Sequence, residues 1–417
     1  MHLAKGSSSL RLIAPSRANN LEPMESNDES LEAAVGSILG FIKRTAEPSE
    51  TGLCWETIDY TNGKHRSPTV FNGVGGIGFF LVDAYRRTGD QEALVLAQGA
   101  IDWSAAFSGK HYKRGLHFGK TGVALAALHK TAALGEKALP EFCRINADTI
   151  LREPPGPVTD LLGGEASNGL YLLKLWEHTR EDTYLNGAER CAAWLGLNMV
   201  RDSNGTHCPI CPDGSLDFPP HSYLGLGHGI SGIAHFLALL AEASGSERWA
   251  NLAREIFDTV ERHAKPTHGG LNWTMRIGSE ELNRCQWSHG AAGIGLTYLT
   301  AHRVLGDARY LDLALQSAEA TYGYGDFRRN CTLSTGLAGG GGLFLEVYRA
   351  TGNKMWKERA YEFAKGCIAY KESTPEGEAW PTDAIGLYSA DFDYGASGVG
   401  HFFMRLLSDG KLDMPVM

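Results

Sequence analysis

Several side chains able to exchange protons or carry charge stand directly before glycine turns. His228 precedes one G-x-x-G turn, and the segment RCQWSHG, residues 284–290, places Arg284 and His289 before another. An imidazole can take or give a proton near neutral pH, and a guanidinium can stabilise an oxyanion as it forms. The pattern therefore favours acid–base chemistry at these turns. The simpler alternatives are a hydrogen-bonded core histidine and a salt bridge from Arg284 to Glu281.

The glycine turn recurs along the whole chain. G-x-x-G, or an imperfect copy of it, precedes an apolar run seven times, with first positions Gly73, Gly119, Ala166, Gly229, Gly290, Gly336 and Gly395. The steps between these positions are 46, 47, 63, 61, 46 and 59 residues. Each run has helical spacing over about 14 residues and ends at a polar break, as an amphipathic helix with a glycine C-cap does. A second helical pattern lies between copies, for example at 91–107 and 308–322.

Seven helix pairs without a separable linker predict one closed or curved helical array. The expected fold is all-α, an α/α toroid (barrel) of seven helix pairs with the G-x-x-G turns at the inner-helix N-termini. Glycine would let the backbones approach one another there and adopt a positive φ. Seven N-termini would also gather positive dipole ends at one mouth, which favours anionic groups. The residues before each turn would surround that mouth.

Composition excludes several classes of partner. The net charge is −9 and no block of Lys and Arg occurs, which argues against nucleic acid and membrane surfaces. No apolar run is long enough to span a bilayer. Residues 1–27, rich in Ser, Asn and Glu, are expected to be disordered, followed by a single toroid domain over 28–417. Eight cysteines without a secretory segment indicate reduced thiols and a cytoplasmic location.

The ordered series of turns, with the residues that flank it, resembles the lanthionine synthetase C-like family over roughly residues 30–410. The resemblance implies an α/α toroid that closes thioether rings by adding a cysteine thiolate to a dehydroamino acid of a ribosomally made peptide. It also implies site residues. His228 matches the family histidine before the fourth turn. Asp160 matches an aspartate before the third turn, and Arg284 matches an arginine three residues before a tryptophan, here Trp287.

The zinc ligands of that family are replaced. Where the family has two cysteines and a histidine, this chain has Ser288, Ser334 and Thr335. Neutral hydroxyls are poor zinc ligands, because thiolate and imidazole are the usual ones. The resemblance therefore implies a variant that works without zinc or another cofactor.

Acid–base side chains would then have to activate the thiol. His228 or His289, which replaces a family tyrosine, would take the thiol proton near neutral pH. Arg284 would stabilise the enolate, and a histidine or Asp160 would return a proton to the α-carbon.

A relocated zinc site is an alternative. Cys285 and Cys331 each lie three residues before a replaced ligand, and Cys208 and Cys211 form a C-x2-C pair beside His207. A lone C-x2-C pair is half a zinc site, and such pairs are common without metal. The simpler interpretation is that these cysteines are buried small apolar residues.

Other polar residues near the turns have competing interpretations. His117 precedes the second turn and fits a packed or a functional histidine equally well. His235 and His401 lie inside apolar helices and are expected to be packing residues. Asp391 and Asp393 precede the seventh turn. Paired carboxylates are found in glycosidases, but aspartates near helix starts are usually caps.

Three functions follow from these patterns. The favoured one is a peptide thioether cyclase of lyase type, which acts on a dehydrated precursor peptide beside a kinase, lyase or decarboxylase of the same pathway. The second is a non-catalytic scaffold that binds such a peptide or its modification enzymes, motivated by the loss of three ligands at once. The third is a carbohydrate-active α/α-toroid enzyme.

Overall fold

The computed structural model describes residues 24–59, 61–111, 114–216, 221–325, 329–384 and 386–414. Residues 1–23 of the expected disordered segment lie outside the described residues. The remainder of that segment, 24–27, is helical, because helix α1 spans Met24–Thr45.

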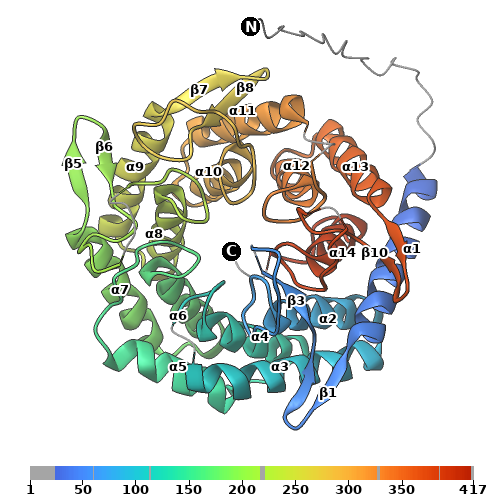
Figure 1. Cartoon of the computed structure of the whole chain (residues 1–417). Coiled ribbons are helices and arrows are strands. Elements are labelled where there is room, and N and C mark those ends of the chain that lie inside the picture. Colours follow the sequence, from blue (N-terminus) through green and yellow to red (C-terminus); the bar gives the residue numbers. More distant parts are fainter. Residues whose placement is uncertain are drawn as a thin grey trace, which may run out of the picture.

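The helices form two concentric rings, as the repeat predicts (Figure 1). The inner helices are α2 (Val74–Thr88), α4 (Lys120–Ala133), α6 (Glu165–Thr179), α8 (Ile230–Ser244), α10 (Ala291–Leu305), α12 (Leu337–Thr351) and α14 (Ala396–Leu407). The outer helices are α1, α3 (Gln91–His111), α5 (Glu141–Arg152), α7 (Asp182–Leu197), α9 (Glu247–Arg262), α11 (Ala308–Tyr324) and α13 (Lys354–Ala369). Each inner helix contacts the next, and α14 contacts both α2 and α1. The ring is closed, and the expected α/α toroid is confirmed.

Inner and outer helices differ in how much of their surface is buried. Helix α8 is apolar almost all round, because it packs against the inner helices α6 and α10 and the outer helices α7 and α9. Helix α9 instead carries one apolar stripe, with Leu252, Ile256 and Val260 buried against the inner ring. The core therefore lies between the two rings.

Every inner helix starts at a glycine, and none of these N-caps in the described chain has a side-chain cap hydrogen bond. Close approach explains the second glycine of the turn. A Cβ on Gly293 would lie 1.9 Å from the Trp287 carbonyl oxygen. The expected positive φ is found only at Gly290, at 106°, whereas the other six N-caps are extended.

The third turn begins earlier than the sequence pattern indicates. The N-cap of α6 is Gly164, not Ala166. Ser167 occupies the position of the second glycine, and its hydroxyl donates to the Gly164 carbonyl at 2.6 Å. Gly169 serves another purpose, since a Cβ there would lie 2.2 Å from the Phe236 ring.

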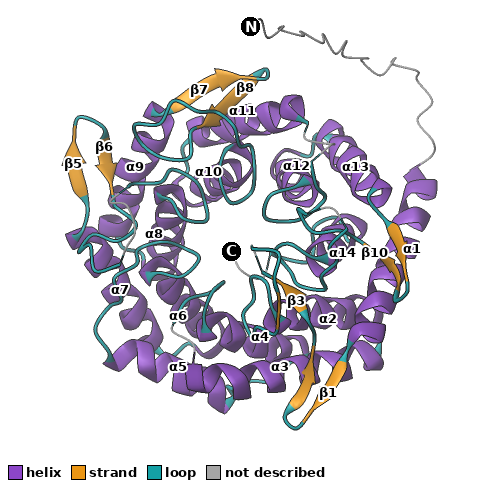
Figure 2. Ribbon diagram, in the orientation of Figure 1, coloured by secondary structure: helices purple, strands orange, loops and turns teal. Residues whose placement is uncertain are grey.

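Two-stranded hairpins account for the long steps between repeats. Four of them follow outer helices: β1 (Glu47–Ser49) with β2 (Gly52–Cys54), β5 (Val200–Asp202) with β6 (Gly205–His207), β7 (Ala264–Thr267) with β8 (Gly270–Trp273), and β9 (Glu372–Thr374) with β10 (Gly377–Ala379). Figure 2 shows these strands around the outside of the helices. A fifth, short pair joins β3 (Thr57–Ile58) to β4 (Lys64–His65).

Three of the four outer hairpins are each anchored by a tryptophan. The indole N–H groups of Trp55, Trp273 and Trp380 each donate to a backbone carbonyl 13 residues earlier, at 2.6–2.9 Å. The fourth hairpin has Cys208 at this position. The sequence contains the signal as G-x-x-W at 52–55, 270–273 and 377–380, a second repeat that the sequence analysis missed.

Candidate active site at the mouth of the toroid

The segments before the inner helices are joined in a ring of backbone hydrogen bonds, which we call the mouth. The bonded pairs, donor first, are Phe71–His117, His117–Leu162, Leu161–Gly227, Gly227–Ser288, Ser288–Ser334, Ser334–Asp393 and Asp393–Phe71, with N···O distances of 2.8–3.3 Å. The last bond returns to the first segment. Side chains that are far apart in sequence are thereby held around one axis.

An aspartate–histidine pair lies at this mouth. The Nδ1 atom of His228 is 2.6 Å from Oδ2 of Asp160. The second oxygen of Asp160 accepts the backbone N–H of Gly163 at 2.8 Å, so the carboxylate is fixed. The Asp160 side chain is 3% exposed and that of His228 is 29% exposed. The pair leaves Nε2 of His228 as the nitrogen available to a substrate, the arrangement of an oriented general base.

His289 lies beside His228 but in a different environment. The two rings stack with centroids 5.7 Å apart, and His289 is buried. Burial, followed by the proximity of His228 and the charge of Arg284, lowers the pKa of His289 to about 3. This environment argues against the expectation that His289 titrates near neutral pH. The ring is neutral, and its buried Nδ1 has no hydrogen-bond partner among the described residues.

Aromatic side chains enclose the histidine pair. Phe118 stacks on His228 at 6.0 Å with an angle of 11° between the rings, and it is 40% exposed. Tyr223 lies 6.4 Å from His228 and 6.1 Å from His289. Phe71 packs edge-on against Phe118 at 4.6 Å. These residues present an apolar surface beside the base, and the sequence analysis did not assign them a role.

Arg284 lies at the exposed rim of the same site. Its side chain is exposed, and its charge contributes to lowering the pKa of His289. Its carbonyl accepts the side-chain amide of Asn272 at 2.9 Å, which anchors the backbone. Glu281, the simpler partner, instead accepts from Asn283 at 3.1 Å. Asp160, His228 and His289 thus lie together at the mouth, and Arg284 lies five residues before His289 in the same segment.

The positions implied as zinc ligands do meet in the structure, but they carry hydroxyls. Ser288 and Ser334 are consecutive members of the mouth, joined by a backbone bond of 3.2 Å. Thr335 follows directly and contacts the hydroxyl of Thr332 at 3.1 Å. Among the described residues, no three His, Cys, Asp or Glu side chains are arranged so that they could hold a metal ion. The side chains at the family positions do not fit zinc.

The four cysteines of the alternative zinc site are engaged elsewhere. The thiols of Cys208 and Cys331 donate to the carbonyls of Asn198 and Pro381, and burial raises the pKa of each thiol to about 12. Cys211 donates to Asp213 at 3.2 Å, and Cys285 to Thr321 at 3.6 Å. Each thiol therefore packs against its own local partner.

A second histidine–carboxylate pair of the mouth is completely buried. The Nδ1 atom of His117 is 2.7 Å from Oδ2 of Asp393, and both side chains are inaccessible. Asp391 accepts the backbone N–H of Tyr394 at 2.9 Å, and burial raises its pKa to about 7. Asp391 thus fixes the turn before α14, although the helix cap itself is Gly395 without a side-chain hydrogen bond. Asp393 does not, because its partner comes from the opposite part of the chain.

Comparison with known proteins now adds to this geometry. The profile described as lanthionine synthetase C-like protein matches residues 64–417. The chain belongs to the lanthionine synthetase C-like family. It is 27% identical over 193 residues to glutathione S-transferase LANCL1 of Danio rerio, a match that covers 46% of this chain and only 45% of that relative. It is 26% identical over 326 residues to LanC-like protein GCL1 of Arabidopsis thaliana, which covers 74% and 72% of the two chains.

Solved structures agree with this family at the level of the fold. Nisin cyclase superposes with a TM-score of 0.63 at 16% identity, over 92% of this chain and 98% of that one. The GH76 α-mannanase BT2949 of Bacteroides thetaiotaomicron gives 0.53 at 13% identity, over 90% and 95%. The LanC-like chain therefore shares its toroid with enzymes of other classes. No helix within the described residues is long and apolar enough to cross a membrane.

Proposed function

We propose that this LanC-like protein adds a thiol to a dehydroamino acid of a peptide and so forms a thioether. The observation that supports this most is the Asp160–His228 pair, with its Nδ1–Oδ2 distance of 2.6 Å, at the partly open mouth beside Arg284. A carboxylate that fixes Nδ1 of an imidazole leaves Nε2 to work as a base. Membership of the family supports the same class of reaction.

The proposed reaction balances without an oxidant or a reductant. Nε2 of His228 takes the proton of the thiol, and the sulfur attacks the β-carbon of the dehydroamino acid. The C–S bond forms as the carbon–carbon π bond breaks, and charge develops on the carbonyl oxygen. Arg284 stabilises that enolate oxygen. The proton held on His228 then passes to the α-carbon, which regenerates the neutral imidazole.

Other residues of the site have narrower roles in the proposed reaction. His289 stays neutral at pH 7, so it would donate or accept a hydrogen bond rather than act as the base. Phe118 would pack against an apolar part of the substrate. We further propose that no zinc takes part at the family position, since Ser288, Ser334 and Thr335 supply only hydroxyls.

The thiol could belong to the same peptide or to a second molecule. One relative carries the name glutathione S-transferase, which makes glutathione a thiol donor to test beside a peptide cysteine. Ring closure, with a dehydrated precursor peptide as substrate, is the favoured case, as the family resemblance implies.

The test uses the full chain with a dehydrated, cysteine-containing peptide and, separately, with glutathione and a cysteine-free dehydrated peptide. Alkylation of free thiols followed by mass spectrometry measures the reaction. We expect thiol loss with the native chain and at least a hundredfold slower loss with His228→Asn. Equal rates in the two proteins would contradict the proposal. Peptide binding without any thiol loss would favour the scaffold function instead.

A further inference from the structure

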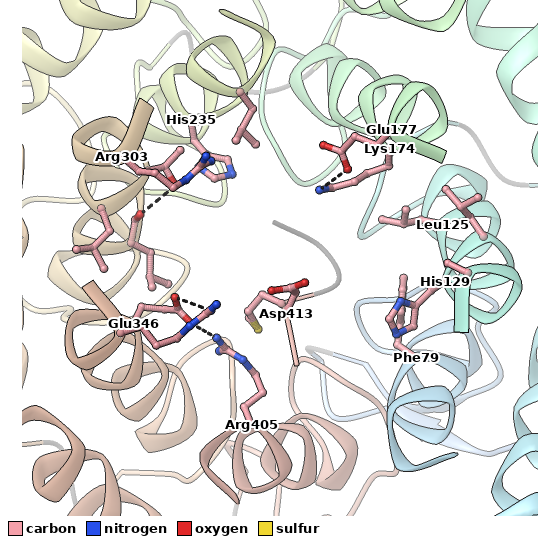
Figure 3. A pocket seen from close by; sticks show the side chains of 18 of the residues that line it. Phe79, Leu125, His129, Lys174, Glu177, His235, Arg303, Glu346, Arg405 and Asp413 are labelled. Atoms are coloured by element: carbon pink, nitrogen blue, oxygen red, sulfur yellow. Dashed lines mark hydrogen bonds and ion pairs between the residues drawn. The ribbon is translucent and has the colours of Figure 1, made fainter. Parts of the chain in front are cut away.

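The ring contains a cavity at the end where the inner helices finish. Its volume is about 1000 Å³, and all seven inner helices contribute side chains (Figure 3). Many of the lining residues, such as Arg86, His178, Arg303 and Arg349, belong to the last turn of their helices. Neither Asp160 nor the other residues of the proposed catalytic site line it. The cavity is thus separate from the mouth and has no role in the proposed reaction.

Leucine side chains line this cavity on more than one side. Leu125 and Leu128 come from α4, Leu239 from α8, and Leu296 and Leu299 from α10. A cavity of this size with apolar walls and a few convergent polar groups has the usual character of a small-molecule site.

The polar groups converge on the wall formed by α6, α8 and α10. His235 lies between Lys174 and Arg303, and Figure 3 shows the three side chains bordering the same space. His235 is 3% exposed, and neither of its ring nitrogens has a hydrogen-bond partner among the described residues. Burial, followed by the charges of Lys174 and Arg303, lowers its pKa to about 3. The imidazole is neutral and can donate one hydrogen bond into the cavity.

The carboxylate partners of the two cations are held weakly. Lys174 contacts Glu177 at 3.1 Å, and Arg303 contacts Glu242. The two glutamates are 50% and 47% exposed, and exposed ion pairs of this kind contribute little free energy. Both cations can therefore turn towards an anion inside the cavity at small cost.

On the α12–α14 side of the cavity, the cations already have a carboxylate partner. Arg349 and Arg405 share the carboxylate of Glu346. Asp413, close to the C-terminus, lies on the Arg405 side in Figure 3, and its charge acts on Arg405. The α6–α8–α10 wall is thus the more favourable place for an additional anion.

We propose that this cavity binds a small amphipathic anion. Its carboxylate or phosphate lies between Lys174, His235 and Arg303, and its apolar body packs against Leu239, Leu296 and the leucines of α4. Charge-assisted hydrogen bonds from the two cations and the neutral imidazole compensate for the desolvation of the anion. The mouth and this cavity then bind different ligands at opposite ends of one ring.

Isothermal titration of the full chain with four eight-carbon probes tests the proposal. Octanoate and octyl phosphate carry the two candidate head groups, while octanol and octylamine share the apolar body. We expect at least one anion to bind at least tenfold more tightly than either control, and the order of the two anions identifies the head group. Equal affinity for all four probes, or no binding of either anion, would overturn the proposal.

Variants that remove positive charges from the cavity test where the anion binds. The double variant Lys174→Met, Arg303→Met keeps the apolar stems of both side chains and should weaken anion binding at least tenfold. Arg86→Met removes one positive charge from the α2 side of the same cavity and should change the affinity less than twofold. Equal losses in the two proteins would assign binding to general charge and contradict the placement. If circular dichroism showed that the double variant was unfolded, the comparison of the four probes on the native chain would still test whether the cavity binds an anion. Because the readout is binding, failure of thiol addition would leave this result unaffected.

Discussion

Three imidazoles at one mouth are placed in three different environments. A fixed carboxylate orients His228, burial keeps His289 neutral, and His117 is paired with Asp393 out of contact with solvent. Environment, rather than residue type, separates a candidate base from a neutral hydrogen-bonding group and from a structural pair. The sequence alone gave His228 and His289 equal standing as bases, and their surroundings now favour His228.

Asp160→Asn tests whether the carboxylate orients the base. The amide keeps the shape of the side chain but removes its charge and changes which atoms of His228 carry the proton. We expect kcat for thiol addition to fall by roughly 10²–10⁴ while KM changes little. The double variant Asp160→Asn, His228→Asn should have a kcat no lower than that of His228→Asn alone, since the two residues act as a unit. Asp202→Asn, at an aspartate–histidine pair in the outer β5–β6 hairpin, is the matched control. A native kcat for Asp160→Asn would contradict the role.

His289→Gln tests the neutral state of the buried imidazole through stability. His289 has a folded pKa of about 3, below its ordinary value of 6.5. Between these values the unfolded chain binds more protons than the folded chain, so the free energy of unfolding falls as the pH falls below 6.5. The loss is about 1.4 kcal/mol per pH unit. Glutamine does not titrate, so between pH 7 and 5 the variant should lose about 2 kcal/mol less than the native chain.

Urea midpoints at the two pH values measure this difference. His302→Gln changes a half-buried histidine and provides the control. The same pH slope in His289→Gln and in the native chain would show that His289 is protonated in the fold.

At the scale of elements, the glycine turn lets each inner helix start in close contact with the segment that precedes it. Gly293→Ala would place a methyl group 1.9 Å from the Trp287 carbonyl oxygen and 2.8 Å from the Leu226 side chain. The turn has to move, and we expect the free energy of unfolding to fall by more than about 2 kcal/mol. Gly36→Ala, inside α1 with no atom within 4 Å of the added Cβ, should instead stabilise the chain by about 0.5–1 kcal/mol. Thermal melts of the two variants should shift in opposite directions.

The same elements show what sequence can and cannot reveal. Glycine turns and helical periodicity are local, so the seven pairs could be predicted, and the outer helices expected at 91–107 and 308–322 agree with α3 and α11 to within about four residues. The third turn was misplaced because Ser167 substitutes for a glycine there, a replacement that only the contact distances explain. The pairs Asp160–His228 and His117–Asp393 join residues 68 and 276 positions apart. No spacing rule predicts them, because closure of the ring determines which segments meet.

For the whole molecule, closure depends on the first described helix. Helix α1 packs on α14 and so completes the outer ring at the point where the first and last described helices meet (Figure 1). Ile38 is fully buried in this contact and approaches Gly400 of α14 closely. The family match begins only at residue 64, so α1 lies outside the matched region although it completes the architecture.

Ile38→Ala tests whether the ring unfolds as one unit. In an open array each repeat contacts only its neighbours, and a defect at one end frays that end alone. In a closed ring the loss at the α1–α14 contact weakens the last helix as well as the first. We therefore expect the global free energy of unfolding to fall by about 2–5 kcal/mol, with coincident transitions by circular dichroism and tryptophan fluorescence. Val95→Ala, at a side chain 67% exposed, should have almost no effect. Hydrogen exchange that speeds up in α1 alone, with α14 unchanged, would show that the two ends are independent and that closure adds no cooperativity.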